Sequence, residues 1–264
     1  MRITILGAGS SIGVPMVGGG WGACDPKEPR NRRRRASILI EDKKAAILVD
    51  SSPDCRQQLL DADVRRLDAV IYTHAHADHI HGIDDLRSIN MAMNTPLAAY
   101  GDARTLETLR SRFGYVFEPL KRFEGRPLLY YKPVLSPREI IGPFSVAGVH
   151  VTPFEQDHGF STTLGLRIGR FAYSTDVMRL DDTAFQVLDG VETWIVDSYR
   201  YQSHPTHAHL ELTLSWIDRL RPQRAIICHM GADLDYHTLR QDLPAGVEPG
   251  YDGMVIEIGA DPDH

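Results

Sequence analysis

Apolar residues occur along the chain in short runs that polar turns separate. Runs of this length are typical of buried β-strands. We predict strands at residues 3–6, 36–40, 45–49, 69–72, 145–151, 163–168, 171–174, 193–196, 225–228 and 254–258. A polar turn at 41–44 joins two of these runs, and Gly169-Arg170 joins another two, so we expect two β-hairpins.

Between these strands, apolar side chains recur three or four residues apart, which indicates amphipathic helices. We predict helices at residues 54–62, 83–93, 102–110, 209–220 and 233–242. Asp102 is a predicted N-cap. Because the strands come in clusters with helices between them, the order favours sheets packed face to face with helices outside over a doubly wound parallel sheet. The segment 114–143 is rich in proline and aromatic residues and shows no clear hydrophobic period. A lid, a dimer contact and a crossing loop are three alternative interpretations of it.

Composition places the chain among ordinary globular proteins. It has 264 residues, of which 42 % are hydrophobic and 24 % are charged, so a disordered or fibrous protein is excluded. The formal net charge of −6 does not favour nucleic acid as a partner. Three scattered cysteines make no disulfide framework, which indicates a reducing compartment. No run reaches the roughly 18 apolar residues of a membrane helix. We therefore expect a cytoplasmic protein that does not enter a membrane.

Histidines are concentrated in one segment. Of the twelve in the chain, four lie within residues 74–81, directly after the strand predicted at 69–72. Side chains of residues two apart at a strand end point the same way, so His74 and His76 can bind one metal ion together. Asp78 and His79 follow on the next turn and can face a neighbouring ion. Imidazole and carboxylate ligands suit zinc, manganese or iron.

The pattern Thr-His-x-His-x-Asp-His-x-x-Gly after an apolar strand resembles the signature of the metallo-β-lactamase superfamily. The resemblance extends over essentially the whole chain and includes Asp50 in Leu-Val-Asp, His158 in Gln-Asp-His-Gly, Asp176 in Ser-Thr-Asp and His229 in Cys-His-Met. It implies an α/β (α+β) fold, an αββα sandwich of two mixed β-sheets flanked by helices. It also implies a single domain over residues 1–264, built from two similar halves.

The resemblance further implies a centre for two divalent metal ions, with zinc or manganese as the candidates. The residues that match the family's ligands are His74, His76 and His158 for one ion, Asp78, His79 and His229 for the other, and Asp176 as the bridge. Asp50 would support the site, and Asp78 and His207 are the candidate catalytic residues. Asp176 stands where the antibiotic-degrading members have a cysteine, so β-lactamase activity is not expected.

Other segments look like the phosphoribosyl cyclic phosphodiesterase group of this superfamily. They are Leu6–Pro15, Arg30–Arg35, His79–Arg87, His204–His207 and Leu234–Tyr236. That group often has several cysteines and a later histidine for a structural zinc ion. Here Cys24 stands alone and Ala232 occupies the position of the histidine, so we expect no structural zinc.

These features together predict a metal-dependent hydrolase that cleaves a small phosphate ester, with cyclic phosphate esters among the candidate substrates. Hydroxide held between the two metal ions would attack the phosphorus. His207 would protonate the leaving oxygen, with His204 and His209 as alternatives. Arg87, Arg200 and Ser10 are the candidate substrate contacts, although Arg87 also suits a structural ion pair. A thioester or lactone hydrolase, an RNA-processing nuclease and a metal-dependent binding protein without turnover remain alternatives. The sequence does not determine the oligomeric state, and a homodimer remains one alternative.

Overall fold

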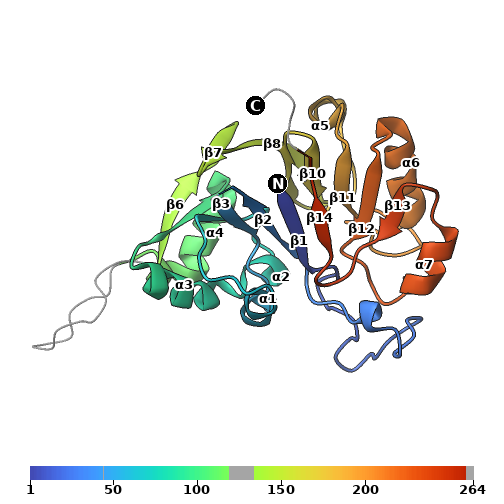
Figure 1. The fold of residues 1–264 in the computed structure, drawn as a ribbon, viewed down its shortest axis with the longest axis horizontal. Coiled ribbons are helices and arrows are strands. Elements are labelled where there is room, and N and C mark those ends of the chain that lie inside the picture. The colour runs from blue at the N-terminus through green and yellow to red at the C-terminus, as the bar shows by residue number, and fades with distance from the viewer. Residues whose placement is uncertain (44, 119–133, 260–264) are drawn as a thin grey trace, which may run out of the picture.

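Two β-sheets of seven strands each form the centre of the molecule, with helices on the outer faces (Figure 1). The computed structural model describes residues 1–43, 45–118 and 134–259. The first sheet consists of β1 (Arg2–Gly7), β2 (Ser37–Asp42), β3 (Ala45–Val49), β4 (Ala69–Ile71), β5 (Leu97–Gly101), β6 (Leu135–Glu139) and β14 (Val255–Glu257), in the order β14-β1-β2-β3-β4-β5-β6.

The second sheet has the same arrangement of pairings. It consists of β7 (Phe144–Val146), β8 (Val149–Asp157), β9 (Thr162–Ile168), β10 (Phe171–Ser174), β11 (Thr193–Asp197), β12 (Arg224–Cys228) and β13 (Val247–Pro249), in the order β13-β12-β11-β10-β9-β8-β7. Each sheet is antiparallel at one end and parallel at the other. The predicted architecture of two packed mixed sheets is confirmed.

Seven α-helices lie in the described part of the chain. They are α1 (Cys55–Asp61), α2 (Ala77–Ile80), α3 (Leu86–Met93), α4 (Ala103–Phe113), α5 (Asp182–Leu188), α6 (Leu210–Leu220) and α7 (Tyr236–Asp242). Short 3-10 turns at Pro29–Asn31, Ile83–Asp85 and Gly114–Val116 complete the elements. No helix among the described residues is long and apolar enough to cross a membrane.

Side-chain alternation in the strands builds two apolar cores. In β2, Ile38 and Ile40 pack into the core that also contains Trp194 of the second sheet, whereas Leu39 between them packs towards α1 and α3. Successive strand side chains point to opposite faces, so a strand covered on both faces must be apolar throughout. This explains why the buried strands appear in the sequence as continuous apolar runs.

The predicted elements agree with the structure in most places. Both hairpins form, and Asp102 caps α4 by accepting a hydrogen bond from the Thr105 backbone N–H at 2.6 Å. The prediction misses α2, β5, α5 and β13. The single strand predicted at 145–151 is wrong, because a turn at Ala147-Gly148 divides it into the antiparallel pair β7 and β8, and β8 continues to Asp157. The helix predicted at 83–93 begins as a 3-10 turn and becomes α-helical at Leu86. Much of the segment 114–143 lies outside the described residues, apart from a 3-10 turn at its start and β6 near its end.

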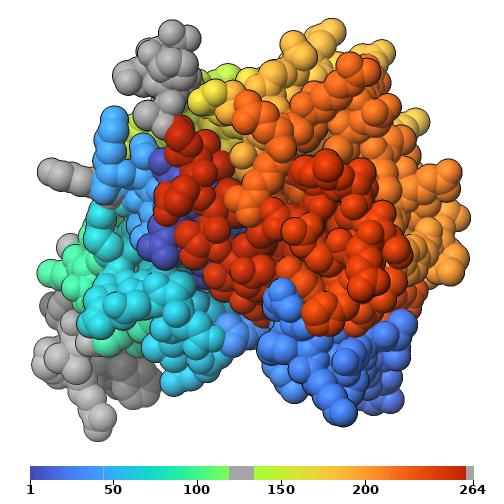
Figure 2. Space-filling model, turned by 45° about the vertical axis from the view of Figure 1, so that its right-hand side comes forward, coloured from blue at the N-terminus to red at the C-terminus, as the bar shows by residue number. Residues whose placement is uncertain are grey.

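The chain between β1 and β2 packs against the segment that leads into α7, as the blue and red-orange surfaces in Figure 2 show. Arg33 lies between them, with only 2 % of its surface exposed. Its guanidinium donates to the carbonyl oxygens of Leu234 at 2.7 Å and Gly231 at 3.2 Å. Cys24 approaches the carbonyl of Ala232 at 3.4 Å. A buried cation therefore joins the two segments that carry Cys24 and Ala232.

Candidate metal centre

The site lies where parallel strands of both sheets end at one edge. Asp50 follows β3 and His74 follows β4 in the first sheet. Asp176 follows β10, Asp197 ends β11 and His229 follows β12 in the second sheet. Because carboxyl ends of parallel strands share one edge, the fold gathers side chains that are far apart in the sequence.

Three of these residues have an unusual backbone conformation. Asp50, Asp176 and His229 have φ angles of 61°, 53° and 56°, in the left-handed region that non-glycine residues seldom adopt. Such conformations cost on the order of 1–3 kcal/mol each and persist where the surroundings hold them. Each lets the chain turn sharply at the end of a strand that leads into the site.

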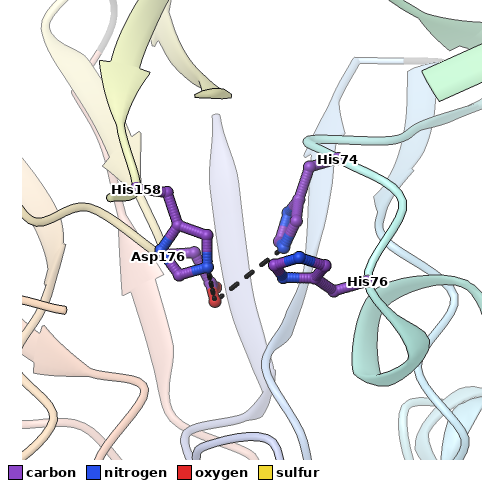
Figure 3. Close-up of side chains that lie close together, drawn as sticks. All are labelled: His74, His76, His158 and Asp176. Atoms are coloured by element: carbon purple, nitrogen blue, oxygen red, sulfur yellow. Dashed lines mark ion pairs between the residues drawn. The ribbon is translucent and has the colours of Figure 1, made fainter. Parts of the chain in front are cut away.

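His74, His76, His158 and Asp176 form one group of side chains, drawn in Figure 3. One donor atom from each lies within 4.8 Å of the others. Oδ1 of Asp176 is 3.9 Å from Nε2 of His74 and 3.8 Å from Nε2 of His158. Three loops, one from the first sheet and two from the second, therefore converge around a space lined by imidazoles and one carboxylate.

Asp78, His79, His229 and the same Asp176 form a second group. Here the other oxygen of Asp176, Oδ2, faces the imidazoles, at 3.0 Å from Nε2 of His79 and 3.4 Å from Nε2 of His229. Oδ2 of Asp78 lies 3.1 Å from the same nitrogen of His79. The two oxygens of Asp176 thus belong to two different donor groups, which is the arrangement of a bridging carboxylate.

Several of these donor atoms are buried without a hydrogen-bond partner among the described residues. They are Nε2 of His74, His79 and His229 and Oδ2 of Asp78. An unpaired polar atom in a protein interior costs about 1–3 kcal/mol, so each requires an explanation. Nitrogen and oxygen donors that converge in this way fit divalent metal ions such as zinc.

Neighbouring groups fix the orientation of the histidines. Nδ1 of His79 lies 2.7 Å from Oδ2 of Asp50, which also accepts a hydrogen bond from the Thr73 hydroxyl at 2.8 Å. Nδ1 of His158 donates to the carbonyl oxygen of Thr206 at 2.6 Å. With the proton on Nδ1, the lone pair of Nε2 is free for a metal ion. Asp50 therefore lies where a supporting residue belongs.

The electrostatics of the two groups differ. Burial lowers the pKa of His74 well below its usual range, so its imidazole is neutral, the form that binds metal. Burial acts in the same direction on His229, but Asp176 and the other nearby carboxylates outweigh it and raise the pKa of His229 to about 9. The carboxylates of the second group thus create a field that favours positive charge.

His207 and Asp197 lie beside the second group. Oδ2 of Asp197 is 3.1 Å from Nδ1 of His207, and its Oδ1 is 3.6 Å from Nδ1 of His229. Asp197 was not among the residues predicted from the sequence, although its position at the end of an apolar strand, like that of Asp50, was a usable signal. Of the three alternatives, His207 alone lines the cavity; His204 faces Thr206, and His209 is the N-cap residue of α6.

A cavity of about 330 Å³ opens over the two groups. His76, Asp78, His158, Asp176 and His207 line it. The structure adds residues that the sequence analysis did not single out, namely Ser11, Arg104, Phe160, Ser161 and Thr206. Ser11 lies in the Leu6–Pro15 segment and Thr206 directly precedes His207, but the sequence did not distinguish either of them from its neighbours. Arg104, Phe160 and Ser161 lie in no motif, because they come from a separate loop and from the first turn of α4.

None of the three candidate substrate contacts lines this cavity. Arg87 lines a separate cavity beside α1 and α3. The guanidinium of Arg200 donates to the carbonyls of Gln202 and Ser203 and so braces its own loop. Ser10 is fully buried, and its neighbour Ser11 lines the cavity in its place. Charge and proximity in the sequence were poor guides here, because the direction of each side chain depends on the fold.

Comparisons with known families, sequences and structures all indicate the same family. The model of the β-lactamase superfamily domain matches residues 45–230. A diphosphatase of the PhnP family has a solved structure that is 29 % identical, with a TM-score of 0.88 over 97 % of both chains. Zinc-bound PqqB from Methylobacterium extorquens shares the fold at 18 % identity, with a TM-score of 0.75 over 98 % of this chain and all of that one.

Two curated relatives carry other names. A protein of Porphyromonas gingivalis named octanoyltransferase is 35 % identical over 98 % of this chain, and the chain spans about half of that relative, 52 %. A ribonuclease Z of Limosilactobacillus reuteri is 30 % identical over 107 residues, which are 36 % of this chain and 35 % of that protein. The fold, the paired histidine and aspartate groups and the family match agree, and the chain belongs to the metallo-β-lactamase superfamily of hydrolases.

Proposed function

We propose that this protein is a two-metal phosphodiesterase that cleaves a small phosphate ester, cyclic esters included. The observation that carries the proposal is the position of Asp176, whose two oxygens face two separate groups of imidazole and carboxylate donors. Paired cations a few ångströms apart recur in enzymes that displace an oxygen at phosphorus. Zinc is the leading candidate for both positions, and manganese is the alternative.

His74, His76, His158 and one oxygen of Asp176 would hold the first ion, and Asp78, His79, His229 and the other oxygen of Asp176 the second. When bound, the two ions would polarise the phosphoryl oxygens and make water a better nucleophile at neutral pH. The side chains do the positioning. Asp176 sets the separation of the two groups, and Asp50 holds His79 with Nε2 directed at the second group.

His207 is placed to move a proton at the cavity wall. It lines the same cavity as Asp78 and Asp176, and its Nδ1 faces Asp197 at 3.1 Å. That contact keeps the proton on Nδ1 when the ring is neutral, and it stabilises the ring when a second proton sits on Nε2. The imidazolium can then donate from Nε2 to the departing oxygen of a phosphate ester.

Two relatives support phosphate chemistry. The PhnP-family diphosphatase, similar along 97 % of this chain, is named for cleavage between phosphates, and the ribonuclease Z match covers about a third of the chain. A ribonuclease activity is therefore a variant of the same proposal with a larger substrate. The cavity of about 330 Å³ above the donor groups suits a small ester.

A second candidate is an acyl thioester hydrolase. The relative named octanoyltransferase favours it, because that name implies an acyl substrate. The same pair of cations could polarise a thioester carbonyl. The chain spans only half of that relative, so the acyl chemistry can belong to the other half of that protein.

The two candidates are separated by one panel of assays. The protein is loaded with zinc or with manganese and offered nucleoside and sugar cyclic phosphates, linear phosphodiesters, an octanoyl thioester and a lactone. The proposal expects turnover of at least one phosphodiester class, with kcat/KM well above that for the thioester. Hydrolysis of the thioester alone would establish the second candidate. Tight metal binding without turnover of any ester would indicate a binding protein.

A further inference from the structure

A chain of buried hydrogen bonds holds the backbone on both sides of Asp176. The amide nitrogen of the Gln156 side chain donates to the carbonyl oxygen of Thr175 at 3.1 Å and to the hydroxyl of Thr163 at 3.1 Å. The Thr163 hydroxyl donates in turn to the carbonyl oxygen of Asp176 at 3.0 Å. Gln156, Thr163 and Thr175 are each only 1 % exposed, so water does not compete for these contacts. We call Gln156 and Thr163 together the Gln156–Thr163 brace.

The brace sets the conformation of Asp176. The carbonyl of Thr175 belongs to the planar peptide group that precedes Asp176, and the carbonyl of Asp176 belongs to the one that follows. Because φ and ψ describe the rotation between these two groups, holding both carbonyls holds the left-handed conformation of Asp176, in which φ is 53°. The hydroxyl of Thr175 donates to Oδ2 of the same carboxylate at 2.7 Å. Hydrogen bonds within the protein thus direct both carboxylate oxygens.

The strand β9 also relates Asp176 to the first sheet. Thr163 lies in β9, and the backbone N–H of its neighbour Leu164 donates to the carbonyl oxygen of Thr73 at 3.0 Å. Thr73 directly precedes His74. One strand therefore holds the backbone of Asp176 through a side chain and the backbone before His74 through a main-chain contact.

The stability of the fold does not explain a glutamine at position 156. Its Oε1 is buried and has no hydrogen-bond partner in the part of the chain that the structure describes, which disfavours the folded state. The adjacent strand leaves room for the side chain, because a Cβ on Gly165 would lie 2.7 Å from this oxygen and 2.2 Å from the ring of Phe154. A methionine could fill the same space without an unpaired polar atom. The amide therefore has a role in the site, where its nitrogen contacts the backbone of Thr175.

We propose that Gln156 is a positioning residue for the carboxylate of Asp176, acting through Thr163 and through the peptide group before Asp176. The inference rests on the metal centre of the proposed function. It adds a residue that is not among the metal donors and does not line the cavity. Without the brace the peptide groups around Asp176 can rotate, and its two oxygens no longer face the two donor groups together. The affinity for metal then falls although every ligand is present.

Competition between the protein and a chelator for zinc tests this assignment and needs no substrate. Gln156→Met keeps the length of the side chain and removes both hydrogen bonds that the amide donates. We expect it to lower the affinity for zinc by roughly 10- to 100-fold, the usual contribution of a residue that supports a ligand. The variant should still bind two equivalents when zinc is in excess. The urea midpoint of the metal-free variant should stay close to that of the wild type, because the unpaired Oε1 is removed together with the two contacts.

A second pair of variants tests the inference if Gln156→Met does not fold. Thr163→Val removes the hydroxyl that donates to the carbonyl of Asp176, and it should lower the affinity for zinc in the same range. Thr163→Ser keeps that hydroxyl and should recover most of the loss. Valine and threonine have the same shape, so this comparison isolates the hydrogen bond.

Gln58→Met is the matched control. Gln58 is also 1 % exposed and donates to the carbonyl oxygen of Arg35 at 2.9 Å, but its own oxygen accepts from the Ser52 hydroxyl at 2.8 Å. We expect Gln58→Met to lower the urea midpoint and to leave the affinity for zinc unchanged, which is the reverse of Gln156→Met. Unchanged affinity in Gln156→Met or in Thr163→Val, or an equal loss in Gln58→Met, would overturn the inference while the metal centre stands. A wild-type protein that binds no zinc would contradict the metal centre and the inference with it.

Discussion

Nδ1 of His207 lies 3.1 Å from the carboxylate of Asp197, which is fully buried at the end of β11. The ring of His207 stacks on that of His229, with centroids 4.8 Å apart and an interplanar angle of 16°. One carboxylate thus faces a ring that belongs to the donor groups and a ring that lines the cavity. His207 is oriented by Asp197, but it is not needed to complete either donor group around Asp176. The role of His207 in proton transfer is therefore separate from the role of His229 as a metal ligand.

Replacing His207 by alanine should lower turnover and leave metal content intact. A positioned general acid contributes roughly 10²–10⁴ in rate, and the loss should shrink on esters with good leaving groups such as p-nitrophenol, which need no proton. The measurement compares kcat on an alkyl and a nitrophenyl ester, with metal content determined on the same samples. If the variant loses metal, His207 is a ligand or a support of one. If it loses nothing on the alkyl ester, His204 or His209 is the next candidate.

Replacing Asp197 by asparagine keeps the shape of the side chain and removes the charge that holds the proton on Nδ1 of His207. We expect a fall in kcat of roughly 10- to 10³-fold on the alkyl ester, with little further loss in the double variant with His207→Ala. Additive losses would show that Asp197 acts on something other than His207, with His229 as the nearest alternative.

Asp50→Asn should weaken metal binding. Asp50 accepts from His79 and from the Thr73 hydroxyl and backbone N–H, and it has no access to the cavity. Supporting residues of this kind typically contribute 10- to 100-fold in metal affinity. Competition with a chelator gives the affinity at each position. Equal affinities in variant and wild type would show that His79 keeps its orientation without Asp50.

Arg33→Met should destabilise the fold without changing activity at saturating metal. The guanidinium satisfies the carbonyl oxygens of Leu234 and Gly231, and their loss of a donor costs on the order of 2–4 kcal/mol in unfolding free energy. Arg32→Met is the control, since Arg32 is exposed and only approaches the Trp21 ring. Urea denaturation measures both. Equal stabilities of the two variants would rule out Arg33 as the link between the segments.

The sequence predicts the part of the site that is contiguous. His74, His76, Asp78 and His79 lie within one turn-forming segment, so local geometry alone brings them together. The predictions of His158, Asp176 and His229 depended on a family resemblance, because three different strand ends bring them to the centre. Arg87 and Arg200 were chosen for charge, and their directions follow from packing that no local pattern encodes.

The elements that the prediction missed have weak local signals. The strand β5 reads Leu-Ala-Ala-Tyr-Gly, and its two alanines resemble a helix as much as a strand. It becomes a strand because β4 and β6 pair with it on either side. The helix α5 has only seven residues, and Asp181 caps it by accepting from the Ala184 backbone N–H at 2.8 Å. Pairing with neighbouring strands therefore determines β5, and the Asp181 cap stabilises the start of α5.

We infer that two metal ions, bridged by Asp176, support phosphodiester hydrolysis. Titration of metal-depleted protein with zinc or manganese, while turnover of a phosphodiester is recorded, tests it most directly. We expect activity to rise to a plateau at two equivalents per chain, and Asp176→Ala to reach no such plateau. A plateau at one equivalent, or no phosphodiester hydrolysis at any metal concentration, would contradict it.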